Sequence, residues 1–375
     1  MSTNQSDGTP GWLAFLRQPV NWLLAGAPAA FAAEAAHASA PLVFLLAGLA
    51  LVPLAMLIVH ATEEIAARTG PAIGGLLNAT FGNLPELIIA MVALRAGLLD
   101  MVRASLIGAL LANLLLAMGV AFLLGGWRRH EQEFNPAAAR TYGSIMLLAA
   151  LSMSAPASFH RLLGEMAPRH ALALDTGVAV VLLALYALYL VFMLRTHPDF
   201  FRIVKGIVKG GEEEHGARWS VARAAGTLVV ASVGAAFMSE VLVGAAEETG
   251  HALGMSAAFI GIVLLAILGG AAELGAAIAM GRKDKMDLSV GIAMGSSIQI
   301  ALFVTPVLVL SSRFIAPERL TLSFTRGEIG ALFFAVLIGI SLAGDGRANW
   351  FKGVQLVGFY LILAAVFFLA PETTS

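Results

Sequence analysis

Two glutamates stand inside long apolar segments of the chain, where an ionised side chain is costly. Glu86 lies in the run Leu76–Ala90, and Glu273 follows Gly269 and Gly270 in a second apolar run. A charge at the middle of a bilayer costs several kcal/mol, so each carboxylate needs a chemical reason to be there. The alternatives to ion binding are a hydrogen bond between packed helices and a position at the lipid interface.

The residues around Glu86 indicate a helix that breaks and restarts. Gly82 and Asn83 interrupt the apolar run, Asn83 is a suitable N-cap, Pro85 suits a first helical turn, and Glu86 stands three residues after the cap. A broken helix leaves backbone carbonyl oxygens free, and hard cations bind such oxygens. We therefore expect a cation site beside Gly82 and Asn83, with Gly269 in the corresponding place before Glu273.

Two carboxylates that meet in mid-membrane suggest a mechanism. Ionised together they repel each other in a poor dielectric, and either a divalent cation or protons relieve the repulsion. A carrier that reorients only when the pair is neutralised must exchange one for the other, which is cation/proton antiport. Calcium fits better than magnesium because it accepts many oxygen ligands in loose geometry. Metals that prefer nitrogen or sulfur are disfavoured, since no His or Cys lies beside either glutamate.

Polar side chains follow each glutamate in the next apolar segment. Asn113 comes after Glu86, and Ser296, Ser297 and Gln299 come after Glu273. Amide oxygens can complete a coordination shell. For the serines, hydrogen bonding between helices is an equal alternative.

Other acidic residues lie near the ends of the apolar segments. Glu240 and Glu247 are seven residues apart and would share a helix face, so with Glu63 they are candidates for a proton or cation pathway. Glu64 and Glu248 are better interpreted as solvated helix ends.

The composition requires these residues to be positioned by membrane helices. Of the 375 residues, 59% are hydrophobic and only 13% are charged, which excludes an ordinary soluble protein. The net charge of −1 offers no basic face for nucleic acid, and the absence of cysteine excludes disulfides and thiolate sites. The apolar runs approach the roughly 20 residues needed to span a bilayer as a helix. We predict eleven spans, at 20–36, 41–67, 71–94, 104–125, 141–158, 172–194, 224–248, 256–280, 288–311, 326–343 and 352–369.

The chain divides into related halves around a polar linker. Glu86 precedes Gly108 by the same number of residues as Glu273 precedes Gly295. Because five is an odd number of spans, two consecutive copies of a five-span unit must enter the membrane from opposite sides. This predicts an inverted repeat of the kind found in secondary transporters. Chance similarity between Gly- and Ala-rich helices is the alternative. The predicted domains are 1–40 (N-terminal tail and leading helix), 41–194 (first five-helix repeat), 195–222 (linker) and 223–375 (second five-helix repeat).

Positive charge predicts the orientation. Most of the 23 Lys and Arg residues fall on the side that holds the N-terminus and the 195–222 linker, so we expect that side to be cytoplasmic and the C-terminus to be on the other side. The linker also carries the acidic run 212–214, for which a solvated loop is a better interpretation than a regulatory cation site. The Ala-rich, Cys-free composition suggests a bacterial inner membrane.

Two segments resemble a known family. Segment 61–94, which contains A-T-E-E-I-A-A-R-T-G and G-N-L-P-E, resembles the first signature repeat of the calcium/proton exchangers in the calcium/cation antiporter superfamily. Segment 281–309 is similar to the stretch after their second signature. The resemblance implies an eleven-helix fold, with a leading helix and two inverted five-helix repeats. It also implies that Glu86 and Glu273 are the paired signature glutamates. Asn83, Glu63 and Ser239-Glu240 match further family positions.

The second signature departs from the family pattern. It usually reads G-N-A-A-E-H, whereas this chain has Gly270 for the asparagine, Leu274 for the histidine and Ala266 for an earlier proline. A lost amide and a lost imidazole bear on calcium affinity and on proton coupling.

The sequence therefore predicts a secondary active antiporter that exports cytosolic calcium in exchange for protons by alternating access, with no cofactor and no enzymatic activity. The alternatives are a sodium-coupled or other divalent-cation exchanger of the same superfamily and a passive channel. An intramembrane enzyme finds no support, because the H-E-x-x-H pattern is absent. The oligomeric state stays open.

Overall fold

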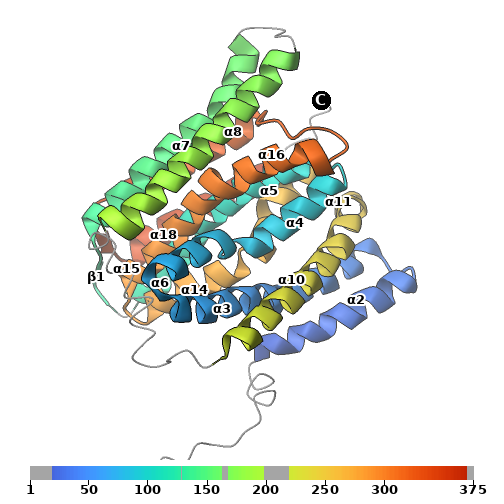
Figure 1. Ribbon diagram of the computed structural model, residues 1–375, viewed down its shortest axis with the longest axis horizontal. Coiled ribbons are helices and arrows are strands. Elements are labelled where there is room, and N and C mark those ends of the chain that lie inside the picture. The colour runs from blue at the N-terminus through green and yellow to red at the C-terminus, as the bar shows by residue number, and fades with distance from the viewer. Residues whose placement is uncertain (1–18, 128, 163–167, 198–218, 370–375) are drawn as a thin grey trace, which may run out of the picture.

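A computed structural model describes residues 19–127, 129–162, 168–197 and 219–369. Within these ranges the chain is almost entirely helical, and the helices are gathered into one bundle (Figure 1). Eight of the described helices are long and apolar enough to cross a membrane. The number is nine if the bent pair Ala246–Leu253 and Ala257–Gly269, at 118°, is one span. The prediction of a helical membrane protein is confirmed for this part of the chain.

The helices are interrupted in several places by short π-helical stretches. The α-helices are α2 Gly26–Ala35, α3 Ala40–Phe81, α4 Leu84–Arg95, α5 Leu99–Leu111, α6 Met118–Gly126, α7 Pro136–Leu162, α8 Pro168–Val191, α10 Val221–Gly244, α11 Ala246–Leu253, α12 Ala257–Phe259, α13 Ala266–Gly269, α14 Ala271–Arg282, α15 Met286–Gln299, α16 Thr305–Ile315, α17 Arg326–Ala343 and α18 Trp350–Leu369. The π-helical stretches are Ala112–Ala117, Phe192–Thr196, Ile260–Leu265 and Ile300–Val304, and a 3-10 helix covers Pro19–Ala25. Strands β1 Gln132–Glu133 and β2 Arg347–Ala348 pair antiparallel.

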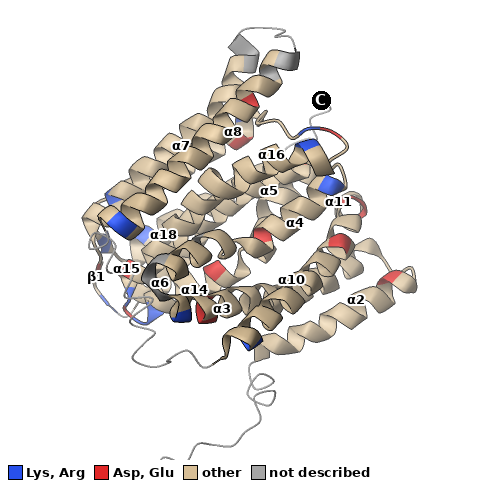
Figure 2. Ribbon diagram, in the orientation of Figure 1, with Lys and Arg blue, Asp and Glu red and all other residues tan. Residues whose placement is uncertain are grey.

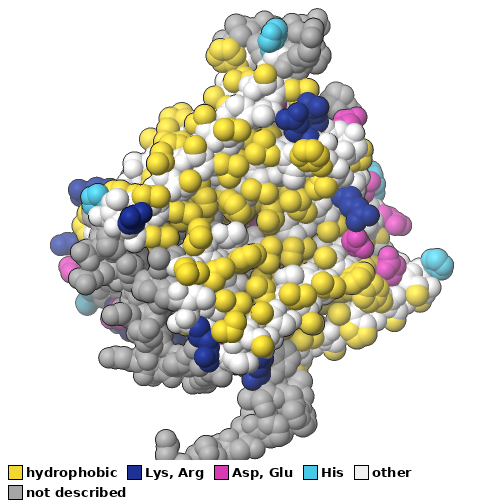
Figure 3. Space-filling model, viewed as in Figure 1, with side chains coloured by type: hydrophobic (Ala, Val, Ile, Leu, Met, Phe, Trp, Pro, Cys, Tyr) yellow, Lys and Arg dark blue, Asp and Glu magenta, His cyan; other side chains and the backbone are white. Residues whose placement is uncertain are grey.

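The outer surface of the bundle is apolar along its length. Figure 3 shows hydrophobic side chains over most of one face, and Val230, Leu188 and Val229 are 72%, 65% and 62% exposed. Soluble monomers rarely expose contiguous apolar patches of this extent, so this surface suits contact with lipid. The charged residues lie mainly toward the two ends of the bundle (Figure 2). We call the end where α10 begins the linker end, and the end where α4 meets α5 the far end.

Several of the predicted spans are not single helices. The prediction at 20–36 corresponds to the 3-10 helix followed by the ten-residue α2, and the prediction at 71–94 is divided between the last part of α3 and the whole of α4. The predictions at 224–248 and 256–280 are also divided, after Gly244 and after Gly269. Helix length alone therefore does not establish eleven spans.

Helix α3 folds back on itself despite its continuous helical backbone. A Cβ added to Gly74 would lie 2.4 Å from the carbonyl oxygen of Ala66, whereas eight residues of straight helix span about 12 Å. The segment between them contains Gly70 and Pro71, and proline lacks the backbone N–H that an inner helical turn requires. The end of α3 therefore runs back into the bundle and delivers the chain to α4.

The centre of the bundle depends on close contact between helices of the two halves. Helix α5 packs against the π-helical stretch Ile260–Leu265. At this crossing a Cβ on Gly108 would lie 2.2 Å from the carbonyl oxygen of Ile262, and a Cβ on Gly261 would lie 2.6 Å from the Cβ of Ala104. Backbones approach this closely only where side chains are absent, as at many helix contacts in membranes.

The loops of the linker end are joined by polar contacts. Gln132 Nε2 donates to the carbonyl oxygen of Gly281 at 3.2 Å and to Asp284 Oδ1 at 2.6 Å. The Asn135 backbone N–H donates to Asp287 Oδ1 at 2.6 Å. These bonds fix the end of α14 and the beginning of α15 against the chain between α6 and α7.

Candidate functional site

Two helix breaks of the same form lie at the centre of the bundle. Helix α3 ends at Phe81 and α4 begins at Leu84, while α13 ends at Gly269 and α14 begins at Ala271. Each break is followed by a helix of 12 residues with a glutamate in its first turn, Glu86 in α4 and Glu273 in α14. The predicted break at Gly82 is therefore confirmed. The beginning of a helix carries a partial positive charge, which favours a carboxylate there.

The side chain of Asn83 has a different partner from the one that its position suggests. Asn83 occupies the N-cap position of α4 but makes no capping hydrogen bond. Its Nδ2 instead donates to Gln299 Oε1 at the end of α15. The expectation of a side-chain cap is wrong, because the amide reaches across to the other half of the chain. The contact joins two residues that sequence analysis placed in one site.

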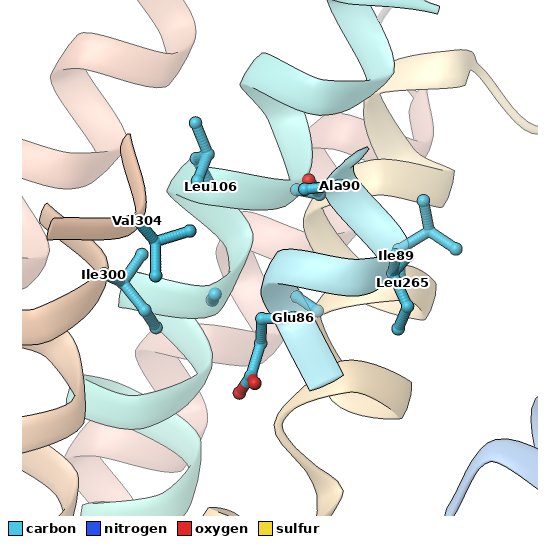
Figure 4. Close-up of a pocket in the computed structure, with 10 residues that line it drawn as sticks. Glu86, Ile89, Ala90, Leu106, Leu265, Ile300 and Val304 are labelled. Carbon is cyan, nitrogen blue, oxygen red and sulfur yellow. The ribbon is translucent and has the colours of Figure 1, made fainter. Parts of the chain in front are cut away.

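Glu86 lies against the glycines of the second break. A Cβ on Gly269 would be 3.2 Å from Glu86 Cγ, and a Cβ on Gly270 would be 3.6 Å from Glu86 Oε1. The carboxyl group of Glu86 extends toward the beginning of α4, away from Ala90 (Figure 4). Glu86 and Glu273 are 9% and 7% exposed, and their carboxyl groups are close enough to interact electrostatically. The structure therefore brings the two candidate glutamates together inside the bundle.

Several buried oxygen atoms of the candidate site residues have no hydrogen-bond donor. Within the described part of the chain they include Asn83 Oδ1, both carboxylate oxygens of Glu86, Asn113 Oδ1 and Glu273 Oε2. Leaving a buried polar atom unpaired costs about 1–3 kcal/mol, and more when the group is charged. Oxygen is also the ligand atom that hard cations prefer. The site is thus built from acceptors that lack donors.

The other candidate ligands occupy the helices that surround the breaks. Asn113 lies in the π-helical stretch Ala112–Ala117, which packs against α14, and such stretches are frequent at functional sites. Ser296 is 9% exposed on α15. Ser297 Oγ donates to the carbonyl oxygen of Ala293 in its own helix, so Ser297 has a structural hydrogen bond.

The three pathway candidates are not brought together. Glu63 has an exposed side chain near the linker end and is close enough to Glu273 to affect it electrostatically. Glu240 lies at the far end, 4.0 Å from Arg95 Nη1, and Glu247 is exposed on α11. The expected common helix face of Glu240 and Glu247 is wrong, because α10 ends at Gly244 and Glu247 belongs to the next helix.

Among the described residues, no group of three or more His, Cys, Asp and Glu side chains is placed to hold a metal ion. A cation at the breaks would therefore be bound by two carboxylates together with amide and backbone oxygens.

A small cavity of about 20 Å³ adjoins Glu86 on the side of the far end (Figure 4). Ser105 lines it and was not singled out by sequence analysis, since a lone serine in an apolar helix gives no local signal. The lining residues are Glu86, Ile89, Ala90, Ser105, Leu106, Ala109, Leu265, Ala266, Ile300 and Val304.

Gly269 provides a test of the contact between the two breaks. We expect Gly269→Ala to slow cation transport about tenfold or more, because the new methyl group must displace the Glu86 side chain and a misplaced binding group is costly. The measurement is the initial transport rate of purified protein in liposomes. Gly275→Ala is the matched control, since a Cβ on Gly275 meets nothing within 4 Å. Equal rates for the two variants would contradict the assigned contact.

The fold and the site together define a class: a helical membrane protein with a paired-carboxylate site between two broken helices. A family model described as sodium/calcium exchanger protein matches residues 39–195 and 223–369. The chain belongs to this family.

Similar proteins match nearly the whole chain. It is 42% identical to a "Ca(2+)/H(+) antiporter" of Synechocystis over 93% of this chain and 96% of the relative. It is 39% identical to the "Ca(2+)/H(+) antiporter ChaA" of Bacillus subtilis over 92% and 97%. The solved structure described as native YfkE matches with a TM-score of 0.80 and 36% identity, covering 94% of this chain and 100% of that one. A structure described as the H+/Ca2+ exchanger CAX shares the fold, with a TM-score of 0.67, 16% identity and coverage of 94% and 92%.

Proposed function

We propose that this protein is a secondary active antiporter that exports cytosolic calcium in exchange for protons by alternating access. The observation that carries the proposal is the set of buried oxygen atoms without a hydrogen-bond donor on Glu86, Glu273, Asn83 and Asn113. Relatives named Ca(2+)/H(+) antiporters, at 39% and 42% identity over more than nine-tenths of the chain, support the choice of ions.

The coordination shell follows from these oxygens. The carboxylates of Glu86 and Glu273 would bind calcium, and Asn83 Oδ1 and Asn113 Oδ1 would add neutral ligands. Gln299 would hold Asn83 in place through the hydrogen bond that its own oxygen accepts. Backbone carbonyls near Gly82 and Gly269, and the hydroxyl of Ser296, are further candidate ligands. Calcium commonly takes six to eight oxygens in such flexible arrangements.

Charge balance then couples the two ions. With both glutamates ionised and the site empty, two negative charges lie in a poorly solvated interior. A change of conformation that closes the bundle around these unneutralised charges is unfavourable. One calcium ion or two protons neutralise the pair equally. The carrier would therefore reorient with calcium or with protons bound, and it would exchange one for the other. Glu63, exposed near the linker end and close to Glu273, would deliver ions from that side.

The finer architecture is part of the same proposal. We propose eleven spans, with a leading helix and two inverted five-helix repeats at 41–194 and 223–375. The same form of break in each half supports this, and so do the two segments matched by the family model, 39–195 and 223–369. We place the N-terminus and the linker end in the cytoplasm, the C-terminus on the other side, and the protein in a bacterial inner membrane. Arg129, Arg140 and Lys283 at the linker end agree with this orientation.

Transport by the purified protein in liposomes tests the proposed function. We expect radiolabelled calcium to accumulate when a pH gradient is imposed and to stop accumulating when the gradient is dissipated. Accumulation driven by a sodium gradient without a pH gradient would favour the sodium-coupled alternative. Calcium flux without any countergradient would indicate a channel. Either result would reject proton antiport.

A further inference from the structure

The cavity beside Glu86 lies between the paired carboxylates and the far end. Helix α4 runs from Glu86 toward Arg95, and the lining residues Ile89 and Ala90 follow Glu86 in that direction. On the same two helices, Leu94 and Val102 lie about one turn nearer the far end than Ala90 and Ser105, and both are fully buried. The cavity is therefore closed toward the far end, in contrast to the exposed Glu63 near the linker end.

We propose that this cavity is the closed far-end half of the ion route and that Ser105 is the polar side chain that contacts the ion as it leaves. The inference rests on the proposed function, because it takes Glu86 as part of the transport site. The ligand class is a hard, hydrated cation, calcium in one direction and protons carried by water in the other.

The difference between the two halves of the chain supports this assignment. When positions are counted from Glu86 in the first half and from Glu273 in the second, Ala109 corresponds to Ser296. In the same way, Ile300 corresponds to Asn113, and Leu265 corresponds to Asn78. Ala109, Ile300 and Leu265 all line the cavity. At each of these three positions, the residue that lines the cavity is apolar and its counterpart in the other half is polar.

An apolar lining of this kind suits a gate. A narrow apolar constriction excludes water and ions until the walls separate, which is one way in which membrane pathways close. The cavity of about 20 Å³ has room for a water molecule but not for a hydrated calcium ion. Release toward the far end therefore requires Leu106, Ile300 and Val304, which line the cavity and are labelled in Figure 4, to move apart.

Ser105 supplies the polar exception in this lining. When positions are counted from Glu86 and Glu273, Ser105 corresponds to Ile292. Here the residue that lines the cavity is polar and its counterpart in the other half is apolar. Ser105 Oγ donates to the carbonyl oxygen of Val102 at 2.9 Å. The hydroxyl proton is thereby engaged, and the oxygen lone pairs are left to accept from water or to bind a cation.

A single thiol tests the route directly, because the chain has no cysteine. Ser105→Cys is nearly isosteric and introduces the only reactive group for a charged, membrane-impermeant thiol reagent. We expect modification from the far-end side alone during turnover, detected as a mass shift, and we expect it to block calcium transport. Ser312→Cys is the matched control, since Ser312 is 1% exposed, bonds within its own helix to Val309, and does not line the cavity. Glu248→Cys, exposed on α11, verifies that the reagent reaches the far-end side.

The outcomes separate the route from the transport function. Modification of Ser105→Cys only from the linker side would overturn the proposed route. So would a transport-competent Ser105→Cys variant that stays unmodified while Glu248→Cys reacts. Ser105→Ala should lower the maximal transport rate about tenfold without changing the half-saturating calcium concentration, and Ser105→Thr should restore it. A wild-type rate in Ser105→Ala would reject the role of the hydroxyl. If Glu86→Gln and Glu273→Gln both retain transport, the proposed function itself fails.

Discussion

Replacing either central glutamate by glutamine is expected to abolish calcium/proton exchange. Glu86→Gln and Glu273→Gln each preserve size and an oxygen acceptor but remove one of the two charges that balance calcium. Removing one charge from a buried, attractive charge pair, here a carboxylate and calcium, costs about 2–5 kcal/mol, which corresponds to roughly 30-fold or more in calcium affinity. Each variant also loses one exchangeable proton, so exchange should fail at high calcium concentration as well.

Two measurements distinguish loss of binding from loss of exchange. Transport is measured as uptake into liposomes under a pH gradient, and binding as the stabilisation of purified protein by calcium, which increases with the ratio of ligand concentration to Kd. Both signals should vanish in the glutamine variants. Glu248→Gln is the control, because Glu248 is exposed on α11 and away from the breaks. Calcium/proton exchange at the wild-type rate in either glutamine variant would remove that glutamate from the site.

The form of the breaks could be predicted from local sequence. Gly82, Asn83 and Pro85 are strong local signals for the end of one helix and the beginning of the next, and they place Glu86 in a first turn. The second break has weaker signals, since Gly270 carries no side chain and no proline follows. Its position was nevertheless predictable from the spacing between each glutamate and the glycine that follows it.

Contacts between the halves could not be predicted in the same way. Asn83 has the residue type of an N-cap, but its amide bonds to Gln299, more than two hundred residues away along the chain. Local propensity describes what a side chain can do beside its own backbone, whereas tertiary packing decides which partner it has. Ser105 illustrates the same limit, because only the folded chain places it beside the cavity at Glu86.

The predicted common helix face of Glu240 and Glu247 fails because of a change of helix. A spacing of seven residues implies a shared face only along an uninterrupted helix, and the chain changes helix after Gly244. Glu240 pairs with Arg95 at the far end, while Glu63 lies near the linker end, next to Glu64, which accepts from the Trp219 backbone N–H. If both contribute to ion movement, they act on opposite sides of the central pair.

Gly108→Ala is expected to destabilise the fold, whereas the same change at Gly295 should be tolerated. The two glycines occupy equivalent positions in the two halves by their spacing from Glu86 and Glu273. A Cβ at position 108 would lie 2.2 Å from the carbonyl oxygen of Ile262 and 2.4 Å from its Cα, so rigid backbone would have to move. Overpacking of this kind costs about 1–3 kcal/mol and sometimes more. We therefore expect a lower melting temperature and less monodisperse protein in detergent.

Gly295 provides the matched control for this prediction because a Cβ there meets nothing within 4 Å. Alanine in the middle of a helix is favoured over glycine by about 0.5–1 kcal/mol, so Gly295→Ala should equal or exceed the wild-type melting temperature. Equal melting temperatures for the two variants would show that α5 and the stretch Ile260–Leu265 do not approach as closely as described. A lower melting temperature for Gly108→Ala and an equal or higher one for Gly295→Ala would show that the two halves differ in their packing. The contact of α5 depends on the absence of a side chain at Gly108, whereas the corresponding position of α15 has no such requirement.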